Sequence, residues 1–299
     1  MEKKEPLVIR FPSRIPSVYM VPFPPGQNCL IDSPSKALSI IARQASDNRI
    51  CLVNPPESVL DRVEKTRDIT LFFDRLPKRE RCSLLSSCPV IVPSLGFYYF
   101  FRQRGINAKL ANLLSSLEIG RTKKMKKTEQ KICLWIDERL VAPRYQAETA
   151  QIVCSLLKKQ SGLDVIWVSE KRRHFSCEGV RFLGTDDADR EEIWKNADVI
   201  LTLGSACQSF VPLHMQLLSK GVAILTDDRG DHGEWVNHLF NGIILDSKET
   251  CKELKRALLR LLKDPGLLER FHHNGPFLLE RMLRTGYGIS TGQFNHSSS

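Results

Sequence analysis

The chain has 299 residues, of which 42% are hydrophobic and 26% are charged. These proportions are normal for a folded globular protein and exclude a largely disordered chain, and the length suits two domains of ordinary size. No apolar run approaches the roughly 18 residues that cross a bilayer, and we expect no secretory signal in the charged N-terminus. The nine cysteines are scattered without a C-x-x-C pair, which favours reduced intracellular thiols over a disulfide framework or a zinc site.

The formal net charge of +10 favours an anionic partner, such as nucleic acid, an anionic membrane face or a nucleotide sugar. No nucleic-acid-binding motif is present, and the basic residues form no stripe with interleaved aromatics, so we expect no nucleic-acid partner. The densest basic run consists of Arg121, Lys123, Lys124, Lys126 and Lys127. It reads as a solvated linker, with peripheral contact to an anionic membrane as the second interpretation.

The first half of the chain alternates short apolar runs with helical windows. Residues 1–17 hold three prolines and predict an irregular lead-in, or a short edge strand at residues 7–11. Further strands are expected at residues 18–22, 50–53, 69–73 and 89–92, with helices at residues 33–45, 55–65 and 78–85. The five consecutive aromatics at residues 97–101 favour a buried helix over a platform for an acceptor.

The second half continues this alternation after a boundary at residues 120–130, where the composition shifts to Lys, Thr and Gln. Strands are expected at residues 131–136, 163–168, 180–183, 199–203 and 222–226, with helices at residues 147–159, 189–196, 212–220, 247–263 and 267–283. Such alternation predicts a parallel sheet with right-handed crossovers. Ligands of these sheets bind at the carboxyl ends of the strands, which here are the loops at residues 137–144, 203–211 and 227–235.

Two stretches resemble a known family. The order V-R-F-L-G … I-W-K-N-A-D-V-I-L … S-F-V-P-L-H-M-Q-L-L-S-K-G-V-A-I-L-T-D-D-R-G … E-W-V … N-G-I-I-L is similar to the donor-sugar domain of family-4 retaining glycosyltransferases. The run C-P-V-I-V-P-S-L-G-F-Y-Y-F-F-R-Q-R-G-I resembles the last strand and helix of their first domain. The resemblance implies an α/β protein with two Rossmann-like domains in the GT-B arrangement, the first of them short. We place an acceptor-side domain at residues 1–122, a donor domain at residues 131–284 and a flexible tail at residues 285–299.

The resemblance also implies a donor site. Arg139 and Arg144 match the spacing of the Arg and Lys in the family's G-R-L-x-x-x-K-G pattern, which faces the donor diphosphate. The family's two glutamates, eight positions apart, correspond to Gln208, at the reacting sugar carbon, and Gln216, at the nucleotide ribose. Ser209 and Phe210 lie between them on the donor side. Glutamine keeps the shape of glutamate but has no charge, so it neither offsets positive charge at the sugar carbon nor acts as a base.

Other acids are candidates for the missing chemistry. Glu234 matches the glutamate of the family's G-x-x-E-x-V pattern and is the second catalytic candidate, with Gln208. Asp227 and Asp228 either substitute for the missing acid or, with Asp231, cap a turn.

The acceptor side departs from the family's His-Asp pair, because Phe73 replaces the histidine while Asp74 is kept. His214 and His232 are candidates for acid–base chemistry or for core packing. No set of His, Cys, Asp or Glu has metal-ligand spacing, so we expect no metal and no cofactor besides the donor.

Three functions are open at this point. The first is a retaining glycosyltransferase that moves a sugar from a nucleotide sugar to an unknown glycan, lipid or protein acceptor. The second is a catalytically inactive relative that binds a nucleotide sugar or serves as a partner subunit, and the third is a nucleic-acid-associated protein, supported by net charge alone. We expect a cytoplasmic location, with peripheral membrane contact as the second interpretation.

Overall fold

The computed structural model describes residues 7–11, 27–30, 33–44, 50–56, 58–60, 69–73, 75–77, 85, 88–111, 113–114, 117, 119, 131–170, 175–185, 187, 193, 196–204 and 208–284. The expected strand at residues 18–22, the basic run at residues 121–127, Asp74 and the tail from residue 285 lie outside these ranges. No helix among the described residues is long and apolar enough to cross a membrane.

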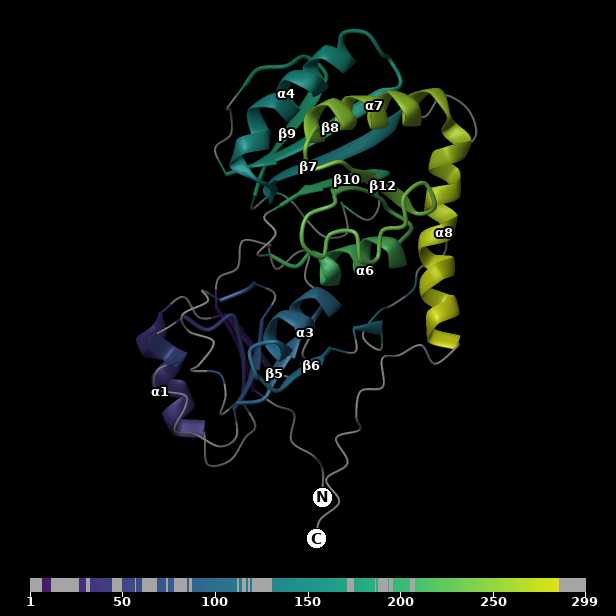
Figure 1. The fold of residues 1–299 in the computed structure, drawn as a ribbon. Coiled ribbons are helices and arrows are strands. Elements are labelled where there is room, and N and C mark those ends of the chain that lie inside the picture. The colour runs from purple at the N-terminus through teal and green to yellow at the C-terminus, as the bar shows by residue number, and fades with distance from the viewer. Residues whose placement is uncertain are drawn as a thin grey trace.

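The described residues form two parallel sheets of six strands, one in each half of the chain (Figure 1). The strands of the first sheet are β1 (Leu7–Arg10), β2 (Gln27–Leu30), β3 (Ile50–Val53), β4 (Ile69–Phe72), β5 (Val90–Val92) and β6 (Ala108–Leu110). Those of the second are β7 (Ile132–Val141), β8 (Leu163–Ser169), β9 (Val180–Gly184), β10 (Val199–Leu203), β11 (Ala223–Asp227) and β12 (Gly242–Leu245).

Helices connect these strands and cover the sheets. The first lobe contains α1 (Pro34–Gln44) and α3 (Leu95–Arg102). The second contains α4 (Pro143–Leu157), α6 (Val211–Ser219), α7 (Thr250–Lys263) and α8 (Pro265–Arg284). The apolar residues of α7 recur every three or four positions and are buried at Leu254, Leu258 and Leu261, as expected for a helix lying on a sheet.

The strand order makes both sheets doubly wound. The first sheet has the order β2-β1-β3-β4-β5-β6, and the second has β12-β11-β10-β7-β8-β9. In the second sheet the chain reverses its direction of winding between β7 and β10, which are hydrogen-bonded neighbours. Ligands of doubly wound sheets bind outside the carboxyl ends of the strands at such a reversal. The loops after β7 and β10 are therefore the first place to look for a site.

Several expectations for individual strands are wrong. The segment at residues 7–11 is not an edge, because β1 pairs with both β2 and β3 and buries Val8 and Ile9 completely. No strand is expected from the sequence at residues 27–30, where β2 directly follows the Pro-Pro-Gly run at residues 24–26. The strand expected at residues 131–136 continues to Val141, and its register against β10 shifts by three residues, so most of the expected loop belongs to a bulged strand.

Each sheet has a hydrophobic cluster of its own, and a further cluster of buried residues spans both lobes. Val53 and Phe72 from the first sheet belong to the same buried cluster as Trp135 and Phe210 from the second lobe. The helix α6 lies between the second sheet and α3, and all nine of its residues are buried (Figure 1). The turn that begins α6 is therefore held at the junction of the lobes.

Candidate functional site

Gly204 and residues 208–210 are the described part of the turn between β10 and α6, and Gln208 contacts the first lobe. A Cβ on Gly204 would lie 2.4 Å from a ring carbon of Phe210, so glycine is required for this ring to close over the end of β10. The Ser209 hydroxyl accepts a hydrogen bond at 3.3 Å from the N–H of Val211, the first residue of α6. Gln208 is 5% exposed and pairs through its backbone with Arg75 of the first lobe. Three of the predicted donor-site residues, Gln208, Ser209 and Phe210, thus lie at the junction.

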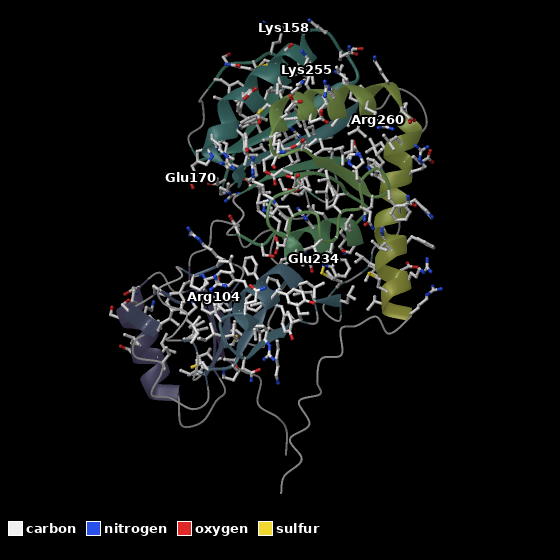
Figure 2. The ribbon with its side chains drawn as sticks, in the orientation of Figure 1. Arg104, Lys158, Glu170, Glu234, Lys255 and Arg260 are labelled. Atoms are coloured by element: carbon white, nitrogen blue, oxygen red, sulfur yellow. The ribbon has the colours of Figure 1, made fainter. Side chains whose placement is uncertain are left out.

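Glu234 joins the second lobe to the N-terminus of α3. Its two carboxylate oxygens accept hydrogen bonds from the N–H of Leu95 at 3.1 and 3.0 Å (Figure 2). The hydroxyl of Ser94 caps the same helix by accepting from the N–H of Phe97 at 3.1 Å. The unpaired N–H groups of a helix N-terminus favour an anion, so this contact places a carboxylate where a negative charge is stabilised. Burial raises the pKa of Glu234 to about 7, and Asp231 adds to this rise, while the N–H groups of Leu95 and Gly96 oppose it.

Asp231 is buried beside Glu234. Its Cβ lies 3.7 Å from the position that a Cβ on Gly96 would occupy, so it contacts the first turn of α3. Burial raises the pKa of Asp231, and the hydroxyls of Ser209 and Ser94 and the charge of His232 oppose the rise. Neither carboxylate oxygen has a hydrogen bond of good geometry with a described residue. The sequence predicts Asp231 as a turn cap, so its burial beside Glu234 is a finding of the structure alone.

A chain of buried polar groups supports the loop that carries these acids. His232 Nδ1 lies 2.5 Å from a carboxylate oxygen of Asp227, whose other oxygen accepts from Arg229 at 3.0 Å. His214 Nε2 lies 2.9 Å from the hydroxyl of Thr202. Burial, together with the nearby His232, lowers the pKa of His214 to about 3, so His214 is neutral at physiological pH. His214 therefore packs against the sheet, and its other ring nitrogen has no described partner.

The predicted diphosphate cations lie at the carboxyl ends of the strands but differ in their surroundings. Arg139 donates two hydrogen bonds, at 2.9 and 2.7 Å, to the fully buried carboxylate of Asp137, which offsets its charge. Arg144 lies exposed in the first turn of α4, with its guanidinium 4.7 Å from the ring centre of Tyr145. Arg229 lies 5.1 Å from the same ring. The structure thus brings Arg229 and Arg144 to the same aromatic ring. Sequence spacing does not predict this proximity, because the two arginines follow different strands.

Of the remaining predicted residues, the structure describes Gln216 and Phe73 but not Asp74. Gln216 lies on α6 and is 4% exposed, and its side-chain oxygen has no hydrogen-bond partner among the described residues. Phe73 is buried in the core of the first lobe, and Asp74 lies outside the described residues. No three His, Cys, Asp or Glu side chains in the described part of the chain gather as metal ligands would.

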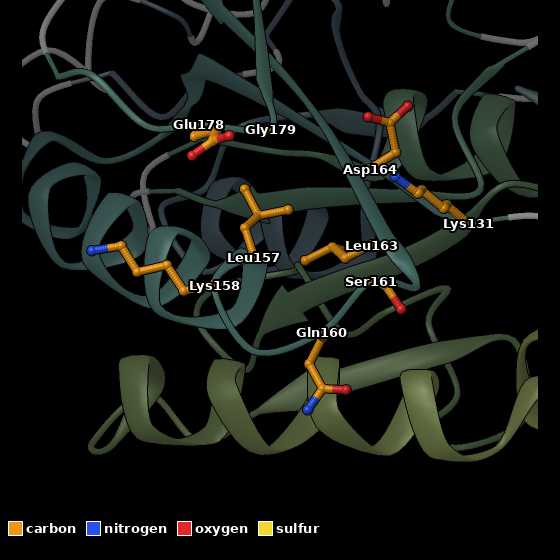
Figure 3. A pocket seen from close by; sticks show the side chains of 9 residues that line it. All are labelled: Lys131, Leu157, Lys158, Gln160, Ser161, Leu163, Asp164, Glu178 and Gly179. Carbon is orange, nitrogen blue, oxygen red and sulfur yellow. The ribbon is translucent and has the colours of Figure 1, made fainter.

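A separate surface pocket lies at the opposite end of the second sheet, where its strands begin (Figure 3). It has a volume of about 290 Å³ and lies at the amino ends of β7 and β8 and the end of α4, where its lining includes Lys131, Lys158 and Asp164. Because doubly wound sheets bind their ligands at the carboxyl ends of the strands, we place the candidate site at the junction of the lobes and not in this pocket.

Comparison with known proteins agrees with this architecture. No protein-family model and no curated protein matches the sequence. Among solved structures, HepE from Anabaena in complex with UDP and glucose matches with a TM-score of 0.64 at 12% identity, over 96% of this chain and 100% of that one. HepE in complex with UDP-glucose matches with a TM-score of 0.63 at 12% identity, over 92% and 94%. A glycosyltransferase from Rickettsia africae matches with a TM-score of 0.62 at 9% identity, over 98% and 100%. The expected fold is confirmed: this chain has the α/β, two-sheet architecture of the GT-B glycosyltransferases.

Proposed function

We propose that this chain is a glycosyltransferase that transfers a sugar from a nucleotide-sugar donor, with UDP-sugars as the first donor class to test. The observation that carries the proposal is the reversal of the second sheet between β7 and β10, where α6 begins after the carboxyl end of β10 and the exposed Arg144 follows β7. The N-terminus of α3 is already occupied by the Glu234 carboxylate, which accepts from the N–H of Leu95. A helix N-terminus and a cation at the carboxyl ends of the strands suit the diphosphate of a nucleotide sugar.

The arginines at the carboxyl ends of the strands of the second sheet also suit a diphosphate. A diphosphate leaving group gains negative charge as its bond to the sugar breaks, and fixed cations and N–H groups stabilise that charge. Arg144 and Arg229 lie next to the reversal point between β7 and β10, beside the ring of Tyr145. In this proposal Arg144 holds the diphosphate, while Arg229 and Arg139 are paired with the buried carboxylates of Asp227 and Asp137 and brace the ends of β11 and β7.

The finer assignments extend the proposal. Gln208, Ser209 and Phe210 contact the donor sugar, Gln216 the nucleotide, and Asp74 the acceptor side. Transfer proceeds with retention of the anomeric configuration and without a metal, as the sequence resemblance implies. HepE was crystallised with UDP and with UDP-glucose, which supports the choice of donor class. We do not propose the inactive partner-subunit alternative, whose support is the pair of amides at Gln208 and Gln216, the phenylalanine at position 73 in place of the family's histidine, and the short first domain.

Release of free nucleoside diphosphate tests the proposal. The full chain is incubated with UDP-glucose, UDP-galactose and UDP-N-acetylglucosamine, with water or a mixed glycan and lipid extract as acceptor, and UDP is quantified. We expect UDP to form from at least one donor, in proportion to protein concentration. If UDP binds but none is released from any donor, the transferase proposal is wrong and only nucleotide binding stands.

A further inference from the structure

The outer side of α7 carries a stripe of cations that the candidate site does not use. Its inner side packs on the second sheet through buried leucines such as Leu254 and Leu258. The basic residues of the outer side are all exposed: Lys252, Lys255, Arg256, Arg260 and Lys263. The acids beside them are already bonded, Glu249 to Lys252 at 2.9 Å and Glu253 to Arg256. The stripe therefore keeps an excess of positive charge.

The stability of the helix does not explain this stripe. Cations stabilise the last turn of a helix, where Arg260 and Lys263 lie, but the first turns favour acids, and Lys252 and Lys255 lie there. Like charges three or four positions apart also repel one another, and Arg260 stands at this spacing from Lys263 and Arg256. Among the described residues, Lys255, Arg260 and Lys263 have no ion-pair partner. An anionic partner would offset the repulsion.

The end of α4 widens the stripe into a surface. A Cβ on Gly162, in the loop after α4, would lie 3.5 Å from a methyl carbon of Leu262, so the C-terminal ends of α4 and α7 lie side by side. Figure 2 shows Lys158, Lys255 and Arg260 in the part of the second lobe farthest from the first. We define the cationic face as the exposed residues Lys158, Lys159, Lys252, Lys255, Arg256, Arg260 and Lys263.

The cationic face lies on the far side of the second sheet from the first lobe. Buried residues of α4 and α7 belong to one cluster, whereas those of α6 belong to the cluster that spans both lobes. The two helices thus cover one side of the sheet, and α6 covers the side toward the first lobe (Figure 1). A partner on the cationic face therefore leaves the junction of the lobes accessible.

We propose that the cationic face binds the surface of an anionic phospholipid bilayer. The helix α7 has 14 residues and is about 20 Å long, so its cations reach several headgroup phosphates at once. Clusters of basic residues bind anionic leaflets through the sum of such contacts. Leu259 and Leu262, half-buried among the cations, add apolar surface that a bilayer covers. Nucleic acid suits the face less well, because α7 has no aromatic residue to stack on a base.

Co-sedimentation of the full chain with vesicles tests this proposal. The vesicles contain phosphatidylcholine alone or with phosphatidylglycerol. We expect the wild-type chain to bind the anionic vesicles, less tightly as salt rises, and to leave the neutral ones in solution. The triple variant Lys255→Gln, Arg260→Gln, Lys263→Gln should bind at least about tenfold more weakly, since each basic residue near an anionic surface contributes a factor of about five. Glutamine is a good helix former, and these side chains are exposed, so the fold should persist.

A matched control removes the same charge elsewhere. Lys36→Gln, Arg102→Gln and Arg284→Gln together change exposed cations on α1, on α3 and at the last residue of α8, and this variant should bind as the wild type does. The single substitution Lys255→Gln repeats the test with the least disturbance and should weaken binding about fivefold.

The other outcomes contradict the proposal. If the wild-type chain does not bind anionic vesicles, or if the triple variant on α7 binds them as tightly as wild type, the cationic face is not a bilayer contact. Equal losses in the two triple variants would assign the binding to net charge and not to this face. Binding to a DNA duplex without binding to vesicles would make nucleic acid the partner. None of these results bears on donor binding, which UDP measures separately.

Discussion

At the scale of single residues, the candidate site keeps the shape of the family's glutamate at Gln208, but its carboxyl groups come from other positions. Gln208 keeps the size of a glutamate, while Asp231 and Glu234 bring carboxyl groups to the same junction from the following loop. The cations are likewise divided, because Arg139 is neutralised by Asp137 whereas Arg144 is exposed beside Tyr145. An exposed guanidinium at the carboxyl end of β7 is free to meet a phosphate, so Arg144 is the residue whose loss should matter most for donor affinity.

Arg144→Ala should weaken binding of UDP about tenfold or more, because a charge-assisted hydrogen bond contributes about 1.5–3 kcal/mol. The side chain is exposed, so the fold should survive. Lys158→Ala is the matched control, since Lys158 is an exposed cation at the other end of α4, away from the site (Figure 2). Titration calorimetry measures both dissociation constants, and an equal effect of the two substitutions would contradict a local role for Arg144.

At the scale of elements, the turn from β10 into α6 positions the donor-side residues. Phe210 fits against Gly204 with no room for a side chain there, and its ring lies 4.7 Å from that of His232. The turn, the loop after β11 and the N-terminus of α3 therefore hold one another in place. A disturbance of this turn should affect both folding and ligand binding.

Gly204→Ala places a methyl group against the rigid ring of Phe210 and should destabilise the protein by about 1–3 kcal/mol, as overpacked cores do. The affinity for UDP should fall as well, because Ser209 and the start of α6 move with the ring. Gly266→Ala is the control: its nearest neighbour, a side-chain oxygen of Asp264, would lie 3.4 Å away. Urea unfolding and calorimetry provide the two measurements, and unchanged stability of Gly204→Ala would show that the turn tolerates the larger residue.

Local patterns predicted most of the elements but not the contacts between lobes. The β10 and β11 runs are short, apolar and fully buried, so their strand character is visible in the sequence. By contrast, β2 follows a Pro/Gly-rich segment and is recognisable only from its pairing with β1, and the extension of β7 depends on its bulge against β10. The contact between Glu234 and Leu95 joins residues 139 positions apart, and no periodicity encodes such a distance.

At the scale of the whole molecule, two doubly wound lobes meet through a shared core and a carboxylate on a helix N-terminus. The junction contains two acids whose pKa values are raised by burial, so its stability depends on pH. The pKa of Glu234 rises from 4.5 to about 7. A carboxyl group with a raised pKa in the folded state stabilises the fold fully below its ordinary pKa, and this stabilisation is lost as pH rises through the higher value.

Glu234→Gln should therefore remove part of the pH dependence of stability. Relative to wild type, the variant should gain about 1–2 kcal/mol of stability between pH 5 and pH 8, after allowance for solvent screening of a partly exposed group. Thermal unfolding across this pH range measures the difference. Parallel pH profiles for the two proteins would contradict the assignment of this titration to Glu234.

The most direct test of the account is whether a diphosphate binds between the lobes. Thermal unfolding of the full chain is followed with UDP, with uridine and with no ligand, for the wild-type protein and Arg144→Ala. At a concentration 100 times its Kd, UDP should stabilise the wild-type protein by about 2.7 kcal/mol, while uridine, which lacks the phosphates, should have little effect and Arg144→Ala should need more UDP for the same shift. Equal shifts with uridine and UDP, or no shift with either, would contradict a diphosphate site at this junction.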